Sequence, residues 1–325
     1  MRLMLIAFIA VGLCAAAQVR VIFDTDMGND VDDALALAIL HAFETRGEAK
    51  LLAVTVTKDN PYAAVLVDVI DTFYRRGEIP IGMVRNGKTP NDSPMIRVPC
   101  ERLNPGGSFV YPRRMALGAA PDAVAILRQT LAREEDASVT IVQVGFSTNL
   151  ARLLDSGADQ YSPLSGAQLV ARKVRLLVAM AGHFPPAQPE YNVVTDVPSA
   201  QKVFAEWPSP VVFSGFEVGA ALLYPARSIE HDFSWVRDHP VVDAYRNYMH
   251  MPYDRPSWDL TAALYAVRPD AGYFKLSAEG TVRVDEKGNT LFTSLAGGKH
   301  RYLILDDAAK ARTLEALTLL ASQPR

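Results

Sequence analysis

Short apolar runs alternate with longer amphipathic stretches along most of this chain of 325 residues. Runs rich in Val, Ile and Leu predict buried strands, whereas apolar side chains that recur with helical spacing predict helices. The predicted strands are residues 19–24, 51–57, 81–84, 139–144, 174–180 and 210–213. The predicted helices are residues 32–43, 62–75, 122–134, 148–154, 197–206, 241–249, 260–267 and 308–322. This alternation predicts an α/β fold whose mostly parallel, open sheet carries helices on both faces.

Two stretches depart from the alternation. TVRVDEKGNTLFTS, residues 281–294, predicts a C-terminal β-hairpin with Lys287, Gly288 and Asn289 in its turn. Residues 85–117 are rich in Asn, Pro, Gly and Arg and lack periodicity. Because so long a structureless stretch is uncommon in a compact domain, it predicts a functional flap or lid. No repeat or Gly/Ser linker divides the chain, which predicts a single catalytic domain over residues 18–325.

The N-terminus has the pattern of a secretion signal. MRLMLIAFIAVGLCAAAQ combines Arg2, an apolar run over residues 3–14 and an Ala-rich cleavage motif at residues 15–17. The run is too short for a comfortable membrane span, and residues 19–24 already supply the first buried strand. We therefore expect a signal peptide at residues 1–17 and a periplasmic or secreted chain that has no membrane partner after cleavage.

Charge and cysteine content narrow the picture further. The formal net charge of -3 and the 49% of hydrophobic residues fit a globular chain with a sizeable core. Without a basic excess, the chain is not expected to bind nucleic acid. Cleavage before Gln18 would remove Cys14 and leave Cys100 alone, so no internal disulfide is expected.

Five carboxylates gather behind the first predicted strand. In VIFDTDMGNDVDDALA, residues 21–36, they are Asp24, Asp26, Asp30, Asp32 and Asp33. Like charges this close raise one another's pKa unless a cation neutralises them, so the loop predicts a bound divalent metal. Oxygen ligands without a nearby His or Cys favour Ca²⁺ or Mg²⁺ over Zn²⁺. Ligands of parallel sheets bind beyond the carboxyl ends of the strands, where this loop should meet the loops at 145–149 and 181–192.

Two other interpretations stay open for this loop taken alone. One is a purely structural metal site or a solvated acidic turn. The other is the strand-D-x-D start of a phosphotransferase of the haloacid dehalogenase type. That motif has Thr or Val where this chain has Gly28, and no convincing acidic pair follows downstream, so the fit is poor.

Five segments occur in an order typical of one enzyme family. They are DTDMGNDVDDALAL (24–37), VGFSTNLARLL (144–154), VRLLVAMAG (174–182), PEYNVVTDVPSA (189–200) and SWDLTAALYAV (257–267). They resemble, in turn, the motif D-x-D-P-G-x-D-D-A, a GPLTNLA turn, a strand ending in MGG, an EFNxxxDPxAA stretch and an HDP-type helix start. Together they resemble the inosine–uridine-preferring nucleoside hydrolases over most of the chain, which is more specific than any single motif.

The resemblance implies a nucleoside hydrolase-like fold that holds a metal ion in its crevice. The implied ion is Ca²⁺, with Mg²⁺ less favoured. Its protein ligands would be Asp26, Asp33, the backbone carbonyl of Thr148, and Asp259. Asp26 would also be the general base for the water that the metal activates.

The resemblance also implies a ribose site. Asp32 would bind the 2′ and 3′ hydroxyls together with Glu190 and Asn192, and Met180 would lie under the sugar. Trp258, next to the predicted ligand Asp259, would stack on the base. The further candidates are Asp24, which would orient the acidic loop, and Asp30, Asn60, Asn149, His183 and Tyr253.

The chain departs from the family pattern in its loops. The acidic loop carries two extra residues, so either Asp30 or Asp32 aligns with the first of the paired carboxylates. We prefer Asp32, because it keeps the pair joined to the following helix. The stretch between Met180 and Glu190 is shorter than in the family, and the family's additional sugar-binding asparagine has no evident match.

Trp258 is the third departure. Many family members place a histidine there, which is associated with protonating a purine leaving group. Tryptophan cannot donate that proton usefully, although it can stack on a base. The remaining candidates for a leaving-group acid are His183, Tyr191, His250 and Tyr253.

The leading prediction is an exported, Ca²⁺-dependent hydrolase of purine or pyrimidine salvage. It would cleave the N-glycosidic bond of ribonucleosides, or of a related ribosyl compound, to free base and ribose. The alternative is a non-catalytic exported protein that binds a ribosyl ligand and keeps the metal site, an idea motivated by Trp258 and the shortened loop. The expected partner is a small-molecule nucleoside. Base preference and a homo-oligomeric state both stay open.

Overall fold

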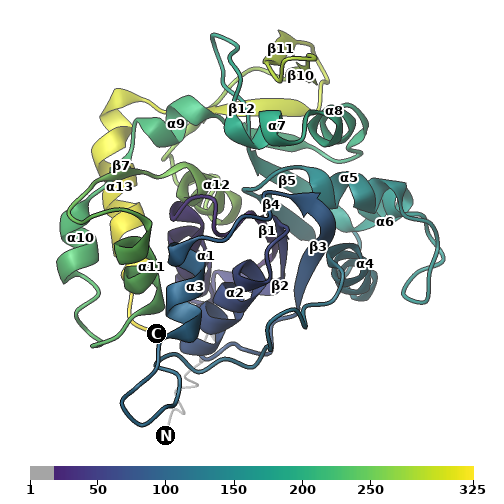
Figure 1. The fold of residues 1–325 in the computed structure, drawn as a ribbon. Helices are drawn as coiled ribbons and strands as arrows, with labels where there is room; N and C mark the ends of the chain where they lie inside the picture. The colour runs from purple at the N-terminus through teal and green to yellow at the C-terminus, as the bar shows by residue number, and fades with distance from the viewer. Residues whose placement is uncertain (1–17) are drawn as a thin grey trace, which may run out of the picture.

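A ten-stranded sheet runs through the molecule in this computed structural model, which describes residues 18–325 (Figure 1). The predicted signal peptide, residues 1–17, lies outside the described residues. The strands follow the order β11-β10-β12-β6-β5-β4-β1-β2-β3, and β9 pairs with β12. Their bounds are β1 Val19–Thr25, β2 Ala49–Lys58, β3 Ile81–Lys88, β4 Val139–Gln143, β5 Val174–Met180, β6 Val211–Ser214, β9 Lys275–Leu276, β10 Gly280–Val284, β11 Thr290–Ser294 and β12 His300–Ile304. A separate two-stranded ribbon pairs β7 (Leu223–Tyr224) with β8 (Arg255–Pro256).

The direction of winding changes beside β1. This strand pairs in parallel with β2 on one side and with β4 on the other. All neighbours from β3 to β12 are parallel, whereas β10 and β11 run antiparallel at the far edge. In doubly wound sheets, such a switch opens a crevice beyond the carboxyl ends of the strands. The loop after β1 therefore leads to the place where a ligand site is expected.

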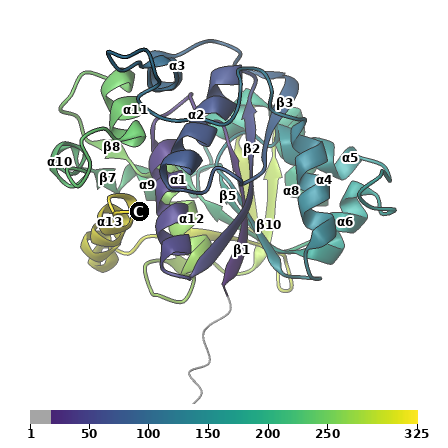
Figure 2. The same ribbon diagram turned by 90° about the horizontal axis from the view of Figure 1, so that it is seen from below.

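Helices cover both faces of the sheet. The helices α1, α2 and α12 pack on one face, and α4, α5, α6 and α8 pack on the other (Figure 2). The bounds of all helices are α1 Asp32–Thr45, α2 Pro61–Phe73, α3 Pro94–Glu101, α4 Ala123–Arg133, α5 Thr148–Asp155, α6 Gly166–Lys173, α7 Tyr191–Thr195, α8 Val197–Glu206, α9 Phe216–Ala220, α10 Ala226–His231, α11 Pro240–Tyr248, α12 Trp258–Val267 and α13 Asp307–Ala321. Within residues 18–325, no helix combines the length and apolar character needed to cross a bilayer.

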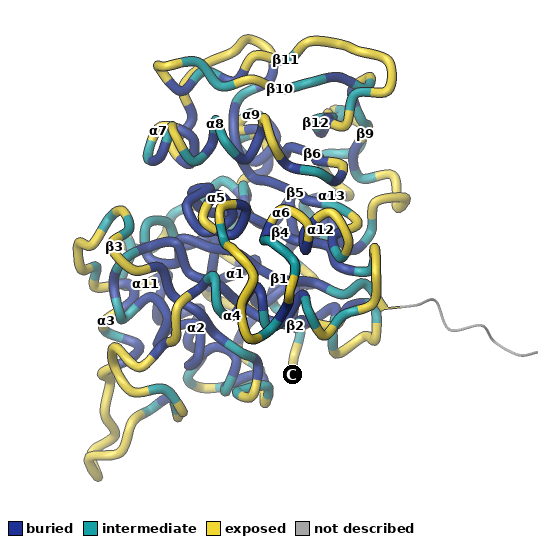
Figure 3. Tube along the Cα trace, turned by 90° about the vertical axis from the view of Figure 1, so that its right-hand side faces the viewer, coloured by how far each residue is buried: buried dark blue, intermediate teal, exposed yellow. Residues whose placement is uncertain are grey.

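Each central strand contributes to two hydrophobic cores. In β1, Val21 and Phe23 belong to one buried cluster and Ile22 belongs to the other. Successive strand residues point to opposite faces, so one continuous apolar run supplies both cores. Figure 3 shows that the central strands and α1 are largely buried, whereas exposed residues lie in the outer loops, on the outer sides of helices and in the edge hairpin.

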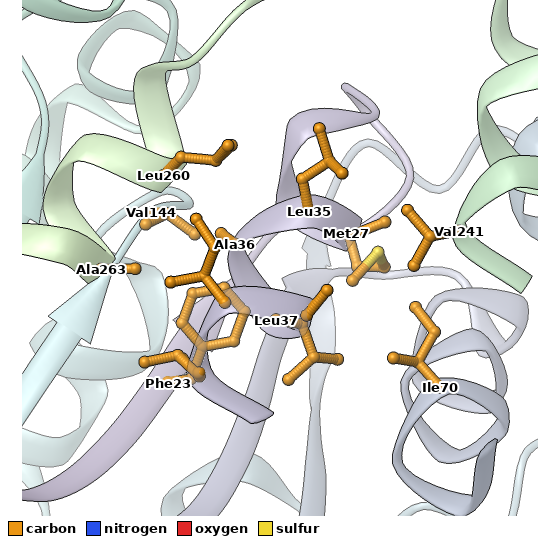
Figure 4. Close-up of a cluster of buried hydrophobic side chains, with 14 of the residues drawn as sticks. Phe23, Met27, Leu35, Ala36, Leu37, Ile70, Val144, Val241, Leu260 and Ala263 are labelled. Atoms are coloured by element: carbon orange, nitrogen blue, oxygen red, sulfur yellow. The ribbon is translucent and has the colours of Figure 1, made fainter. Parts of the chain in front are cut away.

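Helix α1 is buried along most of its length, over residues 32–43. In Figure 4 its side chains lie between those of α12, such as Leu260, and those of α11, such as Val241. Burial of one large aliphatic side chain contributes about 1.5–3 kcal/mol. This packing therefore holds the start of the helix, with Asp32 and Asp33, inside the molecule.

The predicted α/β architecture is confirmed, and so is the C-terminal hairpin, which β10 and β11 form. The sequence pattern does not predict β12, which joins this hairpin to the parallel part of the sheet. Only two of its residues, His300 and Leu303, are buried, so it lacks the apolar run of the central strands. The short helices α6, α7, α9 and α10 are also absent from the prediction.

The expectation that residues 85–117 lack regular structure is wrong, whereas their role as a flap or lid stays a prediction. β3 continues to Lys88, and α3 occupies Pro94–Glu101 within this stretch. The segment after α3 is anchored to the body, because the backbone N–H groups of Arg114 and Met115 donate to Asp68 Oδ2 at 2.7 and 2.8 Å. Proline-rich composition hides α3, since Pro94 lies at the start of the helix, where a proline is tolerated.

Candidate active site

A pocket of about 340 Å³ opens at the ends of β1, β4 and β5, where the sheet predicts a crevice. Carboxylates supply much of its wall. They are Asp26, Asp30, Asp32, Asp33, Glu190 and Asp259. The aromatic side chains of Tyr191, Phe216, Tyr248 and Trp258 line the same pocket.

The loop after β1 turns sharply, so that its carboxylates face inward. The hydroxyl of Thr25 donates a hydrogen bond to Asp33 Oδ1, which ties the start of the loop to its end. Gly28 has a φ of +110°, and a Cβ there would lie 2.7 Å from Cγ2 of Ile96. Glycine alone adopts this turn without displacing its neighbour. The turn brings Asp26 and Asp33 to the same pocket.

Three carboxylates from two helices converge there. Asp32 and Asp33 begin α1, Asp259 lies in the first turn of α12, and one oxygen of each lies within 4.8 Å of the others. The backbone N–H of Asp259 donates to Asp32 Oδ2 at 3.0 Å. Oδ2 of Asp33 is buried and has no hydrogen-bond partner among residues 18–325. Burial and the neighbouring carboxylates raise the pKa of all three carboxyl groups well above the usual range. Because a cation would stabilise their charged forms, the cluster is a candidate cation site.

Asp26 lies beside this cluster. Burial raises its pKa to about 7, while Asn29 opposes the shift by donating from Nδ2 to Asp26 Oδ2 at 2.8 Å. The charge of Asp30 raises this pKa further, and the charge of Lys58 lowers it. The pKa of Asp26 is thus shifted in the same direction as those of Asp32, Asp33 and Asp259, which adds a fourth buried acid to this part of the pocket.

Asp30 faces a cation instead of the cluster. Arg255 donates to it through two nitrogens, with Nε 3.0 Å from Oδ1, which makes a bidentate pair. The guanidinium carbon of Arg255 also lies 5.2 Å from the ring centres of both Tyr248 and Trp258. Asp32, and not Asp30, therefore lies close to Asp33 and Asp259, while the alignment of Asp32 with the family's paired carboxylates stays a prediction.

Fixed polar groups stand at the ends of β4 and β5. Asn192 Nδ2 donates to the carbonyl oxygens of Val144 and Met180 at 2.7 and 3.0 Å. Glu190 caps α7 and accepts hydrogen bonds from the backbone N–H groups of Gly182 and Asn192 at 3.0 and 2.9 Å. Burial raises the pKa of Glu190 to about 7. These bonds hold both side chains in defined orientations at the pocket wall.

Trp258 completes an aromatic wall. Its indole N–H donates to the carbonyl of Phe216 at 2.9 Å, and the two rings tilt against each other with centroids 5.3 Å apart. This bond fixes the indole and occupies its single donor. The pocket thus combines carboxylates on one part of its wall with aromatic side chains on another, an arrangement suited to a polar sugar joined to a flat ring.

A protein-family comparison decides the identity. The model described as "Inosine-uridine preferring nucleoside hydrolase" matches residues 21–315. The chain belongs to this family. It is therefore an N-glycosidic-bond hydrolase by class, in a metal-dependent family that acts on small nucleosides.

Solved structures share the fold of this nucleoside hydrolase. An inosine-guanosine nucleoside hydrolase is 18% identical with a TM-score of 0.70, over 94% of this chain and 99% of that chain. The inosine-uridine preferring enzyme from Bacillus anthracis is 21% identical with a TM-score of 0.64, over 93% and 99%. The type III effector protein XopQ, complexed with adenosine diphosphate ribose, is 17% identical with a TM-score of 0.64, over 95% and 94%. A comparison with curated proteins finds no match.

The structure brings most residues of the nucleoside hydrolase prediction together. The predicted site residues that line the pocket are Asp26, Asp30, Asp32, Asp33, Met180, Glu190, Asn192, Trp258 and Asp259. Asp24 lies deeper and is fully buried. It accepts hydrogen bonds from Thr55 Oγ1 and from Asn149 Nδ2, the latter at 2.8 Å, so both Asp24 and Asn149 support the acidic loop from behind.

Two other predicted residues have partners outside the pocket lining. The hydroxyl of Thr148 donates to Asp196 Oδ2 at 2.5 Å, although Thr148 begins α5 close to the end of β4. Asn60 is the N-cap of α2, and its Oδ1 accepts from the backbone N–H of Tyr62 at 2.9 Å. The role of the Thr148 carbonyl as a metal ligand stays a prediction.

The candidate leaving-group acids differ in position. Tyr191 lines the pocket, whereas His183, His250 and Tyr253 do not. The imidazole Nδ1 of His183 lies 2.6 Å from the carbonyl of Pro186. Sequence reasoning misses Arg255 altogether. The one feature of the sequence that could have indicated Arg255 is its position four residues before Asp259, and no spacing rule marks that position as functional.

Asn29, Phe216 and Tyr248 are also absent from the sequence prediction, although they line the pocket. Asn29 lies inside the acidic loop, where the carboxylates on both sides dominate the sequence pattern, so the asparagine is overlooked as a site residue. Phe216 and Tyr248 lie on α9 and at the end of α11, outside every quoted motif. Their place at the pocket follows from tertiary packing alone.

Proposed function

We propose that this nucleoside hydrolase uses Ca²⁺ to cleave the N-glycosidic bond of ribonucleosides, or of a related ribosyl compound, to free base and ribose. The observation that supports this most is the convergence of Asp32, Asp33 and Asp259 beside Asp26 in one pocket. Family membership supports the reaction class, and the arrangement of side chains supports the roles given below.

The carboxylate set fits Ca²⁺. The orphaned, buried Oδ2 of Asp33 and the raised pKa values around it both favour a cation. Ca²⁺ accepts oxygen ligands in flexible geometry, whereas Mg²⁺ needs a nearly ideal octahedron, so we prefer Ca²⁺. We assign Asp26, Asp33, Asp259 and the carbonyl of Thr148 as its protein ligands. Bound there, the ion would supply a Lewis acid that makes a water molecule easier to deprotonate and that clamps the ribose diol.

Asp26 would accept the proton of the attacking water. The hydroxyl of that water then joins the anomeric carbon of ribose, the bond from this carbon to the base nitrogen breaks, and the base departs with its bonding electrons and gains a proton. Positive charge develops on the sugar ring during this step, and carboxylates beside the ring stabilise it.

Asp32, Glu190 and Asn192 would hold the ribose hydroxyls. Glu190 and Asn192 are already fixed by backbone hydrogen bonds, so they lose little freedom when the sugar binds. Met180, at the end of β5, would lie under the sugar. Positioning of this kind places the anomeric carbon against the base and the water, which removes an entropic part of the barrier.

The aromatic wall would receive the base. Trp258 has its indole N–H committed to the carbonyl of Phe216, so it would bind the base by stacking and not by proton donation. Of the candidate acids, Tyr191 is the one that lines the pocket, and we assign it as the donor of the leaving-group proton.

A reducing-sugar assay over purine and pyrimidine nucleosides tests this function. We expect ribose release with Ca²⁺, loss of release in chelator, and a fall of about 100-fold or more in kcat for Asp26→Ala, since general bases contribute on this order. The exposed carboxylate Glu230 offers the matched control, because Glu230→Ala should retain wild-type activity. A Ca²⁺-loaded protein that leaves the whole panel intact would contradict the proposal.

The second candidate is an exported protein that binds a ribosyl ligand without turnover. Trp258 in place of the usual histidine favours it, and a structural neighbour was solved with adenosine diphosphate ribose. Calorimetry that detects nucleoside binding, combined with no reducing sugar after hours of incubation, would favour this candidate. Measurable turnover would exclude it.

We further propose that the protein is exported. The basic start, apolar run and Ala-rich motif of residues 1–17 support it. N-terminal sequencing of the protein recovered from periplasm or medium should begin at Gln18. Recovery of the uncleaved chain from the cytoplasm alone would contradict the proposal.

A further inference from the structure

A buried lysine lies behind the acidic loop. Lys58, the last residue of β2, has 2% of its surface exposed and forms no salt bridge among residues 18–325. Its ammonium group donates to Oδ1 of Asn29 at 2.9 Å and to the carbonyl of Thr89 at 2.8 Å. A buried charge is costly unless it is well solvated by polar partners, so this lysine calls for a specific explanation.

Asn29 connects the lysine to the proposed base. Its Nδ2 donates to Asp26 Oδ2 at 2.8 Å and to Thr89 Oγ1 at 3.1 Å. The ammonium of Lys58 is only a donor, so it fixes the carbonyl end of the Asn29 amide on its own side. The amino end then has to point toward Asp26. The lysine therefore prevents an amide flip that would place two acceptor oxygens against each other.

The backbone is shaped to hold this network. Thr89 has a φ of +50°, an uncommon conformation for a residue with a branched Cβ. Gly28 allows the loop to press against the lysine, because a Cβ at that position would lie 3.1 Å from Cδ of Lys58. Three separate segments, the acidic loop, the end of β2 and the start of the segment after β3, thus meet behind Asp26.

We propose that Lys58, Asn29 and Thr89 are positioning residues for the hydrolysis, which hold the Asp26 carboxylate in the orientation that both the metal and the water require. The inference rests on the proposed function and deepens it. It also gives a role to the longer acidic loop, since Asn29 is one of the residues that this lengthened loop presents to Asp26. One carboxylate oxygen of Asp26 is held by the amide, and the charge of Lys58 strengthens that hydrogen bond by polarising the amide.

Four variants test the proposal. Lys58→Met keeps most of the length of the side chain but removes its donors, and Asn29→Ala removes the connecting amide. The double variant Lys58→Met/Asn29→Ala tests whether the two act in series. The control is Lys88→Met, because Lys88 is exposed and lies opposite Lys58 in the register of β2 and β3. For each variant, kcat and KM for nucleosides, the dissociation constant of Ca²⁺ by calorimetry and the crystal structure are measured.

Each single variant should lower kcat at least about 10-fold with a smaller change in KM. Both should weaken Ca²⁺ binding and rotate the Asp26 carboxylate in the crystal. Because residues in one network are non-additive, the double variant should be little worse than the poorer single variant. Lys88→Met should resemble the wild type in every measurement. If Lys58→Met does not fold, Asn29→Ala still tests the proposal, because Asn29 lies on a loop and its substitution leaves the core intact.

Wild-type kcat and Ca²⁺ affinity in Lys58→Met would overturn the proposal, and so would independent, multiplicative effects of the two substitutions. Failure of the proposed function looks different, because the wild type itself would then release no ribose from any nucleoside. In that case the Ca²⁺ dissociation constants and the Asp26 conformation still decide whether Lys58 and Asn29 position this carboxylate.

Discussion

Asp259 and Asp30 are both acidic residues of the pocket wall, yet their surroundings differ. Asp259 belongs to the cluster that calls for a cation, whereas Asp30 is neutralised by Arg255. The same chemical group therefore has two roles here, which its neighbours set. The sequence alone does not separate them, since each is simply an aspartate in a motif of the predicted site.

Substitution of these two residues should separate the roles. We expect Ca²⁺ to stabilise the wild type and Asp30→Asn against thermal unfolding, by about 2.7 kcal/mol when the ion is present at 100 times its dissociation constant. Asp259→Asn should lose this stabilisation, because the cluster then lacks one of its three charges. Thermal unfolding with Ca²⁺ and with chelator measures the difference. Equal Ca²⁺ responses in both variants would show that Asp259 is not a ligand.

Trp258 allows a second prediction at this scale. Stacking of a base on an aromatic side chain contributes about 1–3 kcal/mol. Trp258→Ala should therefore raise KM for nucleosides about tenfold, while Trp258→Phe, which keeps a stacking face, should remain within a few fold of the wild type. Steady-state kinetics measure both. If the two variants behave alike, Trp258 serves only as a structural partner of Phe216.

At the scale of elements, local periodicity is enough to predict the central strands and the long helices. The three carboxylates of the cluster can also be picked out from the sequence, because each of them lies in a short motif. The pair of Asp30 and Arg255 is not, since its members stand 225 residues apart and meet through packing alone. The same holds for Lys58 and Asn29, whose contact depends on how β2 lies against the loop after β1.

The helix α11 begins in an unusual way, with the imidazole of His239 as its cap. Nδ1 accepts a hydrogen bond from the backbone N–H of Val241 at 3.2 Å, and the ring lies among aromatic side chains such as Phe73, whose centroid is 4.4 Å away. Burial lowers the pKa of His239 to about 3. Protonation would remove the acceptor that caps the helix.

This cap should make stability depend on pH. Below about pH 6.5, His239 is protonated in the unfolded chain but stays neutral in the folded chain. The contribution of His239 to the free energy of unfolding therefore falls as the pH drops from about 6.5 toward 3, by up to about 1.4 kcal/mol per pH unit. His239→Asn keeps a capping acceptor without this titration. Urea unfolding at pH 7 and pH 5 should show that the stability of His239→Asn relative to the wild type is greater at pH 5 than at pH 7. The same relative stability at both pH values would mean that the fold does not lower the pKa of His239.

At the scale of the whole molecule, the buried acids act together. Burial raises the pKa of Asp24, Asp26 and Glu190 to about 7, and the clustered acids shift in the same direction. Between about pH 4 and pH 7 the folded chain without metal thus binds more protons than the unfolded chain. Its stability should fall as the pH rises through this window, because the acids must ionise in the interior.

Ca²⁺ should reverse that trend. A bound cation replaces the protons, so the free energy of unfolding with Ca²⁺ should no longer fall between pH 5 and pH 7.5, whereas it should fall in chelator. Urea unfolding across this range, with and without Ca²⁺, measures both curves. Two identical curves would show that these acids form no metal site.

The separate ribbon of β7 and β8 has a consequence for how such an enzyme changes over time. Arg255 lies in β8 and Phe216 in α9, so the aromatic part of the pocket is built outside the main sheet. The acids after β1 and the residues at the ends of β4 and β5 are built on the sheet itself. Phe216 and Arg255 are therefore carried by a part of the chain separate from the acids after β1, whereas Trp258 shares α12 with Asp259. Exchange of residues 216–256 between relatives would therefore alter one part of the pocket wall, with Phe216, Tyr248 and Arg255, and leave the proposed bond-breaking groups in place.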